Sequence, residues 1–227
     1  MKVLITGTSS GLGKSLVNKF NELDIETIGI SKSHSKETNH ICNFLDIDKL
    51  STTIEDILNN NNDIDYVFLN AGMLGRIEKA NKINQQEINE VLQVNVFSNK
   101  IILDKIISKQ TKIKNIILIS SGASINVYDG WLLYCLTKSA ANQMIKCYSI
   151  ENKDIHFLCL APGIIQTKMQ DEIIKNDDIK FSSIKKFKQL YGSNNTPDLV
   201  ASKVIKNLKM FSNLESGHYF DLRSLND

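Results

Sequence analysis

Short apolar segments alternate along the chain with longer segments in which apolar residues recur at roughly every third or fourth position. The short segments are rich in isoleucine, valine and phenylalanine at consecutive positions, which is typical of strands covered on both faces. They predict strands at residues 3–6, 26–30, 40–45, 65–70, 114–120, 155–161 and 218–222. The longer segments predict amphipathic helices at residues 11–23, 48–60, 86–109, 131–151 and 196–211.

This order of elements is the pattern of repeated strand–helix–strand units. It predicts an α/β fold with a single, doubly wound parallel sheet of about seven strands and helices on both faces. The 227 residues fit one domain spanning 1–227. Only the segment at about 166–192 departs from the alternation, and it follows a predicted strand. Because ligands bind beyond the carboxyl ends of parallel strands, we expect this segment to be an inserted substrate loop.

Composition narrows the class of partner. Hydrophobic residues make up 42% and charged residues 23% of the chain, as in a packed globular domain, and the net charge is only +2. So small a charge argues against nucleic acid or a membrane surface as partner, and no apolar run approaches the ~20 residues of a membrane span. The four cysteines are scattered and the four histidines lack metal-ligand spacing. We therefore expect reduced thiols, a cytoplasmic location and no metal site.

A glycine-rich segment, Thr6–Gly13, joins the first predicted strand to the first predicted helix. Gly7 would permit the tight turn, Gly11 the approach of a pyrophosphate to the backbone, and Gly13 close packing of helix on strand. The exposed amides at the start of the helix would then meet the phosphates. The segment predicts a Rossmann-type NAD(P)-binding domain; the alternative is merely a tight turn between strand and helix.

The end of the second predicted strand bears on the choice of dinucleotide. Strands that bind NAD usually end in an acid that takes the ribose hydroxyls, but this one ends Ser31-Lys32-Ser33. A lysine between two hydroxyls suits a 2′-phosphate, so we expect NADP, with NADPH preferred over NADH. Only Arg76 and Arg223 among the 27 basic residues are arginines, so a point charge replaces a guanidinium fork here. The alternative is that Lys32 is one more solvated lysine.

Further residues follow the third and fourth predicted strands. Asp46 would meet the adenine, and Asn70-Ala71-Gly72 would let the backbone pass near the adenine ribose. Both segments therefore extend the expected cofactor site along the same edge of the sheet.

A tyrosine and a lysine one helical turn apart form the candidate catalytic pair. Tyr134 and Lys138 share one face of the predicted helix after the fifth strand, and Ser121 closes that strand. A phenol with a pKa near ~10 needs a nearby cation to exchange protons close to neutrality. Asn95 adds an amide on the apolar stripe of the long helix, where burial requires partners; the alternative is an asparagine bonded to a neighbouring carbonyl.

Together these residues resemble the short-chain dehydrogenase/reductase superfamily over nearly the whole chain. The motifs stand in the family's order at Thr6–Gly13, Asn70–Gly72, Asn95, Ser121, Tyr134, Lys138, Pro162-Gly163 and Thr167. The resemblance implies that Tyr134 protonates the carbonyl oxygen during reduction and that Lys138 lowers its pKa and holds the nicotinamide ribose. It also implies that Ser121 polarises the carbonyl and that Asn95 anchors a water.

The resemblance also implies which residues bind the cofactor. They are Gly7, Ser9, Ser10, Gly11, Leu12, Gly13, Ser31, Lys32, Asp46, Ile47, Asn70, Ala71, Gly72, Tyr134, Lys138, Pro162, Gly163, Ile165 and Thr167.

Segments 129–135, 161–170 and 216–221 resemble sepiapterin reductases and the related bacterial benzil (diketone) reductases. In sepiapterin reductases an acid in the last segment grips the pterin, and Asp221 falls at the matching position; the alternative is a plain turn residue. Ser121, Trp131 and Met169 are the other expected substrate contacts, and Phe181 is a further candidate for the pocket wall, though each apolar one is equally suited to plain core.

These observations favour an NADPH-dependent oxidoreductase that reduces the carbonyl of a small ketone or dicarbonyl to an alcohol. One alternative is an NAD-dependent alcohol dehydrogenase or 3-oxoacyl-type reductase, and another is a non-catalytic dinucleotide-sensing module. The family resemblance further implies a homodimer or homotetramer formed through the helices at 86–109 and 131–151. The physiological substrate and the stereochemistry of the product are left open by the sequence.

Overall fold

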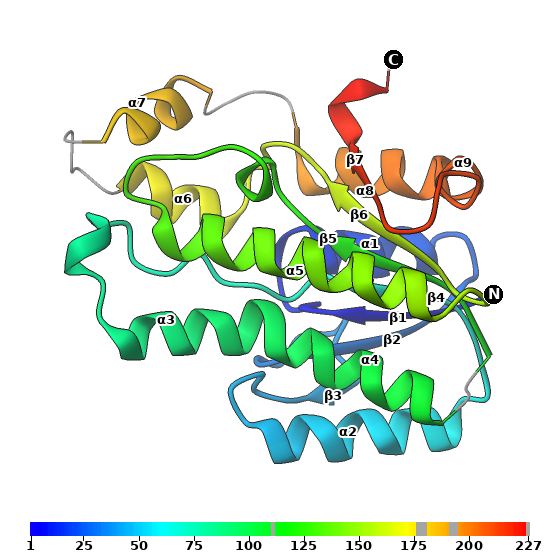
Figure 1. The fold of residues 1–227 in the computed structure, drawn as a ribbon. Helices are drawn as coiled ribbons and strands as arrows, with labels where there is room; N and C mark the ends of the chain where they lie inside the picture. Colours follow the sequence, from blue (N-terminus) through cyan, green and yellow to red (C-terminus); the bar gives the residue numbers. More distant parts are fainter. Residues whose placement is uncertain (110–111, 176–180, 191–194, 226–227) are drawn as a thin grey trace.

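The computed structural model describes residues 1–109, 112–175, 181–190 and 195–225. These residues form one seven-stranded sheet with helices packed on it (Figure 1). The strands are β1 (Lys2–Thr6), β2 (Glu26–Ser31), β3 (His40–Ile41), β4 (Asp63–Leu69), β5 (Lys112–Ile119), β6 (His156–Ala161) and β7 (His218–Asp221). The predicted α/β fold is confirmed.

All strands run parallel in the order β3-β2-β1-β4-β5-β6-β7. The strand order changes direction at β1, because β2 and β3 lie on one side of it and β4 to β7 lie on the other. Loops after β1 and β4 therefore diverge from a common point, which is where open α/β sheets bind ligands.

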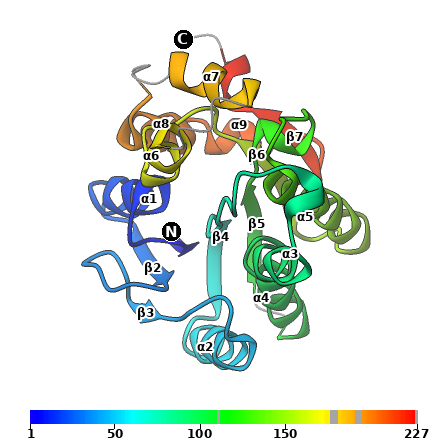
Figure 2. The same cartoon turned by 90° about the vertical axis from the view of Figure 1, so that its left-hand side faces the viewer.

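Helices cover both faces of the sheet. They are α1 (Gly11–Asn21), α2 (Ile47–Asn60), α3 (Gln85–Leu92), α4 (Ser98–Ser108), α5 (Leu132–Glu151), α6 (Lys168–Lys175), α7 (Ser182–Gln189), α8 (Pro197–Lys206) and α9 (Leu208–Phe211). Figure 2 shows α1, α8 and α9 on one face and α2, α4 and α5 on the other. Two apolar cores result, which is why the central strands have near-continuous apolar sequences.

Three predicted elements differ from the structure. The strand at 40–45 ends at Ile41, because Asn43 begins a turn in which its carbonyl accepts from the Asp46 amide at 2.9 Å. The helix at 86–109 is interrupted by a π-helical turn at Gln93–Phe97. The helix at 196–211 divides at Asn207, which separates α8 from α9.

The segment at 166–192 contains two short helices where the sequence pattern predicted only an irregular insertion. Figure 1 shows α6 and α7 beyond the carboxyl edge of the sheet, near the N-terminal end of α5. Residues 176–180 and 191–192 of the segment lie outside the described residues. Within the described part of the chain, no helix is long and apolar enough to span a membrane.

Candidate active site

A cavity of about 990 Å³ opens at the carboxyl edge of the sheet. This volume is at the upper end of the range for small-molecule and cofactor sites. It extends from the glycine loop to the N-terminal half of α5, and most of the predicted site residues line it. These are Gly7, Ser9, Ser10, Gly11, Leu12, Ser31, Lys32, Asn70, Ala71, Gly72, Ser121, Trp131, Tyr134, Lys138, Pro162, Gly163, Ile165, Thr167 and Met169.

The glycine loop forms one end of the cavity. Gly7 has φ +75° and Gly11 has φ +57°, a backbone region that favours glycine. The loop is joined to the turn after β4, because the Thr6 hydroxyl accepts from the amides of Asn70 and Ala71, both at 2.9 Å. The structure thus brings two sequence motifs more than sixty residues apart into direct contact.

The start of α1 borders the cavity through Ser10, Gly11 and Leu12. Its N-cap residue, Ser10, makes no side-chain capping bond. Helix N-termini carry a partial positive charge and free N–H groups, which bind phosphate. The cradle therefore fits a dinucleotide pyrophosphate, and Gly11, Leu12 and Ser10 are the residues positioned to hold it.

Gly13 fills the packing role that its position in the motif predicts. A Cβ at this residue would lie 2.3 Å from the Gly7 carbonyl oxygen and 2.5 Å from Asn70 Nδ2. Gly13 does not line the cavity. Its lack of a side chain lets α1 approach the loop closely enough to shape the cradle.

Changing Gly13 to alanine is therefore expected to destabilise the protein by about 1–3 kcal/mol, since overpacking against backbone cannot relax easily. Urea unfolding measures this change. Gly122→Ala is the matched control, because the nearest atom to a Cβ at Gly122 would be Asn126 Nδ2, at 3.7 Å. Equal stability of the two variants would contradict the packing role of Gly13.

The end of β2 provides the candidate 2′-phosphate contact. Lys32 is exposed and lines the cavity. The Ser31 hydroxyl donates to the Ser33 carbonyl at 2.6 Å and lies 3.0 Å from Thr38 Oγ1. Ser31 has therefore already used its only proton, so Lys32 is the better placed donor of the two.

Besides Gly13, two residues expected to bind the cofactor, Asp46 and Ile47, do not line the cavity. Asp46 instead begins α2 as its N-cap, accepting from the Lys49 amide at 3.0 Å, and Ile47 is the first residue of that helix. The neighbouring residues Asn43 and Phe44 line the cavity instead. The turn that ends β3 early accounts for this shift.

Ser121, Tyr134 and Lys138 lie together at the other end of the cavity. Tyr134 and Lys138 are on one face of α5, with Lys138 Nζ 5.6 Å from the centre of the Tyr134 ring. Lys138 is 6% exposed, and its Nζ donates to the Ile119 carbonyl at 2.7 Å. Ser121 Oγ accepts from the Ala123 amide at 3.1 Å, which leaves the serine proton available to another acceptor.

Burial governs the protonation of both helical residues. It raises the pKa of Tyr134 to about 12, although a hydrogen bond with Ser121 acts in the opposite direction. It lowers the pKa of Lys138 to about 8. In the protein alone, desolvation thus outweighs the lowering of the tyrosine pKa that was expected from Lys138. At neutral pH the phenol keeps its proton and the amine is mostly charged.

Asn95 is buried behind this pair, in the π-helical turn. Its Oδ1 accepts from the Met73 amide at 2.8 Å, and its Nδ2 donates to the Met73 carbonyl and to Thr137 Oγ1, each at 2.9 Å. The amide ties the segment after β4 to α5. It does not line the cavity, although a Cβ on Gly72 would lie 3.3 Å from its Oδ1 and 3.7 Å from Lys138 Nζ.

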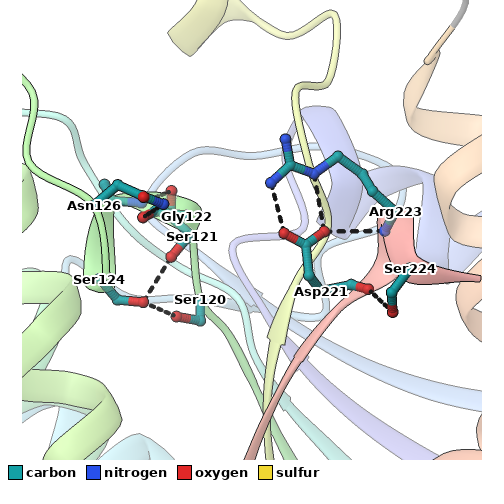
Figure 3. Close-up of polar contacts among 9 residues, drawn as sticks. Ser120, Ser121, Gly122, Ser124, Asn126, Asp221, Arg223 and Ser224 are labelled. Atoms are coloured by element: carbon teal, nitrogen blue, oxygen red, sulfur yellow. Dashed lines mark hydrogen bonds and ion pairs between the residues drawn. The ribbon is translucent and has the colours of Figure 1, made fainter.

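Two hydroxyls and an amide hold the turn that carries Ser121, and no pattern in the sequence predicts these contacts. The Ser124 hydroxyl donates to the Ser121 carbonyl at 2.7 Å, as Figure 3 shows. Ser120 donates to Asn142 Oδ1 at 2.6 Å, and Asn142 Nδ2 donates to Ser124 at 2.8 Å. Because these contacts join the turn to α5, they fix Ser121 relative to Tyr134.

Aromatic residues form the wall beside the catalytic candidates. Trp131 stacks on Phe187 with ring centres 4.7 Å apart and meets Tyr134 edge-on at 6.0 Å. Tyr128 and Met169 line the same part of the cavity. Phe181, expected in this wall, instead packs behind it against Gly130. The sequence pattern did not single out Tyr128 or Phe187, which come from a loop and from α7.

Asp221 ends β7 with its carboxylate occupied. It accepts from Arg223 Nε at 2.9 Å and from Nη2 at 2.6 Å (Figure 3). Arg223 lines the cavity, whereas Asp221 does not. The role of Asp221 as a pterin anchor stays a prediction, and Arg223 is a cavity residue that sequence reasoning missed. The feature of the sequence that could have drawn attention to Arg223 is that the chain has only two arginines.

The sequence profile of short chain dehydrogenases matches residues 1–178, which carry the glycine loop and the Ser121, Tyr134 and Lys138 cluster. The chain belongs to this family. It is an NAD(P)-dependent oxidoreductase, as the motif order predicted. Members of the family generally act on small molecules and are often oligomeric.

Curated relatives and a solved structure agree with this assignment. The chain is 26% identical over 239 residues to benzil reductase ((S)-benzoin forming) of Bacillus subtilis (strain 168), covering 97% of each protein. It is 29% identical over 108 residues to a Xenopus laevis sepiapterin reductase, covering 45% of this chain and 41% of the relative. The crystal structure of the Saccharomyces cerevisiae short chain dehydrogenase/reductase YIR035C superposes with a TM-score of 0.86 at 22% identity, covering 98% and 96%. The predicted likeness to both kinds of reductase is confirmed.

Proposed function

We propose that this protein is an NADPH-dependent reductase that converts the carbonyl of a small ketone or vicinal dicarbonyl to an alcohol. One observation carries the proposal: a protonated phenol, a hydroxyl and a buried amine meet at one end of a cavity whose other end is a phosphate cradle. The benzil reductase of Bacillus subtilis, similar over almost its whole length, supports a diketone as the model substrate.

The chain's own residues have distinct parts in this reaction. The Ser121 hydroxyl donates its proton to the carbonyl oxygen, since its bond from the Ala123 amide uses a lone pair and not the proton. Tyr134 then delivers its proton to that oxygen, and its raised pKa keeps the proton available at neutral pH. The charged Lys138 stabilises the phenolate that is left. Asn95 would accept a bond from the water that the family resemblance implies only through its Oδ1, since both Nδ2 protons bond to Met73 and Thr137. When bound, the reduced nicotinamide supplies the hydride.

The cofactor would lie along the cavity from Lys32 to Lys138. Gly7, Gly11 and the first amides of α1 would hold the pyrophosphate, and the backbone of Ala71 and Gly72 would border the ribose. The residues that follow β6 would face the nicotinamide end. These are Pro162, Gly163, Ile165 and Thr167.

The cavity wall suits a small apolar substrate. Trp131 and Met169 would contact it directly, since both line the cavity beside Tyr134. Phe97 and Leu136 expose 46% and 43% of their surface, on the π-helical turn before α4 and on α5. These exposed apolar side chains support pairing of two or four copies through α4 and α5.

Steady-state kinetics test the proposal. We expect the protein to oxidise NADPH in the presence of a vicinal diketone such as benzil, with one hydroxyketone formed for each NADPH consumed. NADH should support a lower kcat/KM. Equal or better use of NADH would contradict the cofactor assignment, and consumption of neither cofactor with any ketone or diketone would contradict the reductase assignment.

Lys32→Ala tests the cofactor preference residue by residue. Loss of one charged contact to a phosphate is expected to raise KM for NADPH about tenfold and to leave KM for NADH nearly unchanged. Lys36→Ala is the matched control, because Lys36 is an exposed lysine of the same loop outside the cavity. If both variants bind NADPH like the wild type, another group recognises the 2′-phosphate.

A further inference from the structure

The substrate end of the cavity contains a guanidinium that the reaction does not use. Arg223 follows β7, and its backbone amide and its Nε both donate to Asp221 Oδ1, at 3.0 and 2.9 Å. Its Nη2 donates to Asp221 Oδ2 at 2.6 Å. The carboxylate thus holds one edge of the guanidinium plane in a fixed orientation (Figure 3).

Glycines place this group beside the catalytic serine. The aliphatic stem of Arg223 passes over Gly163, where a Cβ would lie 3.2 Å from both Cγ and Cδ of the arginine. A Cβ on Gly122, the residue after Ser121, would lie 3.8 Å from Arg223 Nη2 and also 3.8 Å from the Tyr128 hydroxyl. A Cβ at Gly163 would therefore press on the stem of Arg223, whereas a Cβ at Gly122 would make only ordinary contact with its guanidinium.

The second edge of the guanidinium, formed by Nη1 and the other Nη2 hydrogen, has no bonding partner in the described part of the chain. Its side chain is 58% exposed although it lines the cavity. A guanidinium edge with two parallel N–H groups matches a carboxylate, which accepts both bonds at once.

A second cation lies nearby. Lys186 of α7 holds its Nζ 5.7 Å from the centre of the Tyr128 ring and lines the cavity. Lys168 and Glu172 of α6 also line it. Asp221 balances the charge of Arg223, and the Lys186 ammonium beside Tyr128 adds a positive charge to this part of the cavity wall.

We infer that Arg223 recognises a carboxylate on the substrate, so that the preferred substrates are keto acids and not uncharged diketones. Asp221 is then a positioning residue that orients Arg223. The inference rests on the proposed reductase function and deepens it. In the reaction the carbonyl carbon gains a hydride from NADPH and its oxygen a proton from Tyr134, giving a hydroxy acid and NADP⁺. The carboxylate itself is unchanged.

Matched pairs of acid and ester substrates test the inference. Benzoylformate and benzoylpropionate are each compared with their methyl esters, since esterification removes the charge and leaves the reacting ketone in place. We expect kcat/KM for at least one acid to exceed that of its ester by about tenfold, chiefly through KM. An ester preferred over its acid in both pairs would overturn the inference.

Arg223→Met separates recognition from a structural role. It is expected to lower the acid-to-ester ratio of kcat/KM about 10–100-fold, and Arg223→Lys should restore part of that ratio. Lys185→Met is the control, because Lys185 is an exposed lysine of α7 outside the cavity. Equal losses with acid and ester in Arg223→Met would show that the arginine only supports the fold of the site.

A binding measurement does not depend on turnover. Trp131 is the only tryptophan of the chain and lines the cavity, so its fluorescence reports occupation of this site. Benzoate should quench it at lower concentration than benzamide in the presence of NADP⁺, and Arg223→Met should remove the difference. If benzoate binds through Arg223 but no carbonyl compound is reduced, the reductase proposal fails and the carboxylate site stands. If ketones are reduced but benzoate and benzamide bind alike, the carboxylate site fails and the reductase proposal stands.

Discussion

Tyr134→Phe is expected to lower kcat/KM for a diketone about 10²–10⁴-fold, which is the usual contribution of a positioned general acid. The substitution removes the only atom that the proposal assigns to proton delivery. It retains the ring, which meets Trp131 edge-on, so the cavity wall should keep its shape. The rate of NADPH oxidation measures the loss.

Tyr148→Phe is the matched control for this substitution. Tyr148 is on the same helix, α5, but its hydroxyl bonds to Asp104 and does not line the cavity. Its replacement should leave turnover within about threefold of the wild type, as is common away from an active site. Unchanged turnover in Tyr134→Phe would rule out Tyr134 as the proton donor.

Lys138→Met has the second largest expected effect, and it should separate activity from stability. We expect kcat/KM to fall about 10²-fold or more, because the phenolate left by proton transfer loses its cation. Stability at pH 7 should be unchanged or higher, since the methionine avoids burying a charge in a site that is 6% exposed. The Ile119 carbonyl loses its donor, which offsets part of this gain.

The contribution of Lys138 to the free energy of unfolding should change with pH. Burial lowers the pKa of Lys138 to about 8 from the ordinary lysine value of 10.5. Between these values the unfolded chain binds more protons than the folded one, so this residue makes the free energy of unfolding rise with pH. The difference in stability between Lys138→Met and the wild type should therefore shrink from pH 8 toward pH 10.5. A constant difference across this window would show that the buried amine does not titrate there.

The activity should also depend on the ionisation of Lys138, but it should fall as the pH rises, whereas the stability should increase. The wild-type kcat/KM for reduction is expected to decline as pH rises through about 8, because Lys138 loses its charge. Lys146→Met, at an exposed position of α5, should keep this decline, and Lys138→Met should lack it.

Much of the fold could be predicted from local sequence. Strands such as β1 and β5 have consecutive apolar residues because both of their faces are covered, and this pattern marks them unmistakably. The predicted strand at 40–45 was too long because the turn at Asn43 depends on specific hydrogen bonds and not on hydrophobicity. The π-helical turn around Asn95 was not predicted either, because its apolar residues recur with the same period as those of the flanking helices.

The same distinction applies to the candidate site, whose motif residues could be predicted from the sequence and whose positioning contacts could not. Residues in compact motifs, such as Gly7, Ser121 and Tyr134, line the cavity as predicted. The contacts that hold the turn of Ser121 include the bond between Ser120 and Asn142, which are 22 positions apart, and no local pattern marks them. Asp221 was singled out by position alone, yet the structure presents Arg223 to the cavity in its place.

The sequence by itself determined the fold class, the phosphate cradle and the serine, tyrosine and lysine of the cavity, because each depends on spacing along one strand, turn or helix. The tertiary structure decided the protonation of Tyr134 and Lys138, because desolvation depends on every element packed around them. It also decided that Arg223 faces the substrate end while Asp221 holds it, since the two glycines beside the arginine come from other parts of the chain.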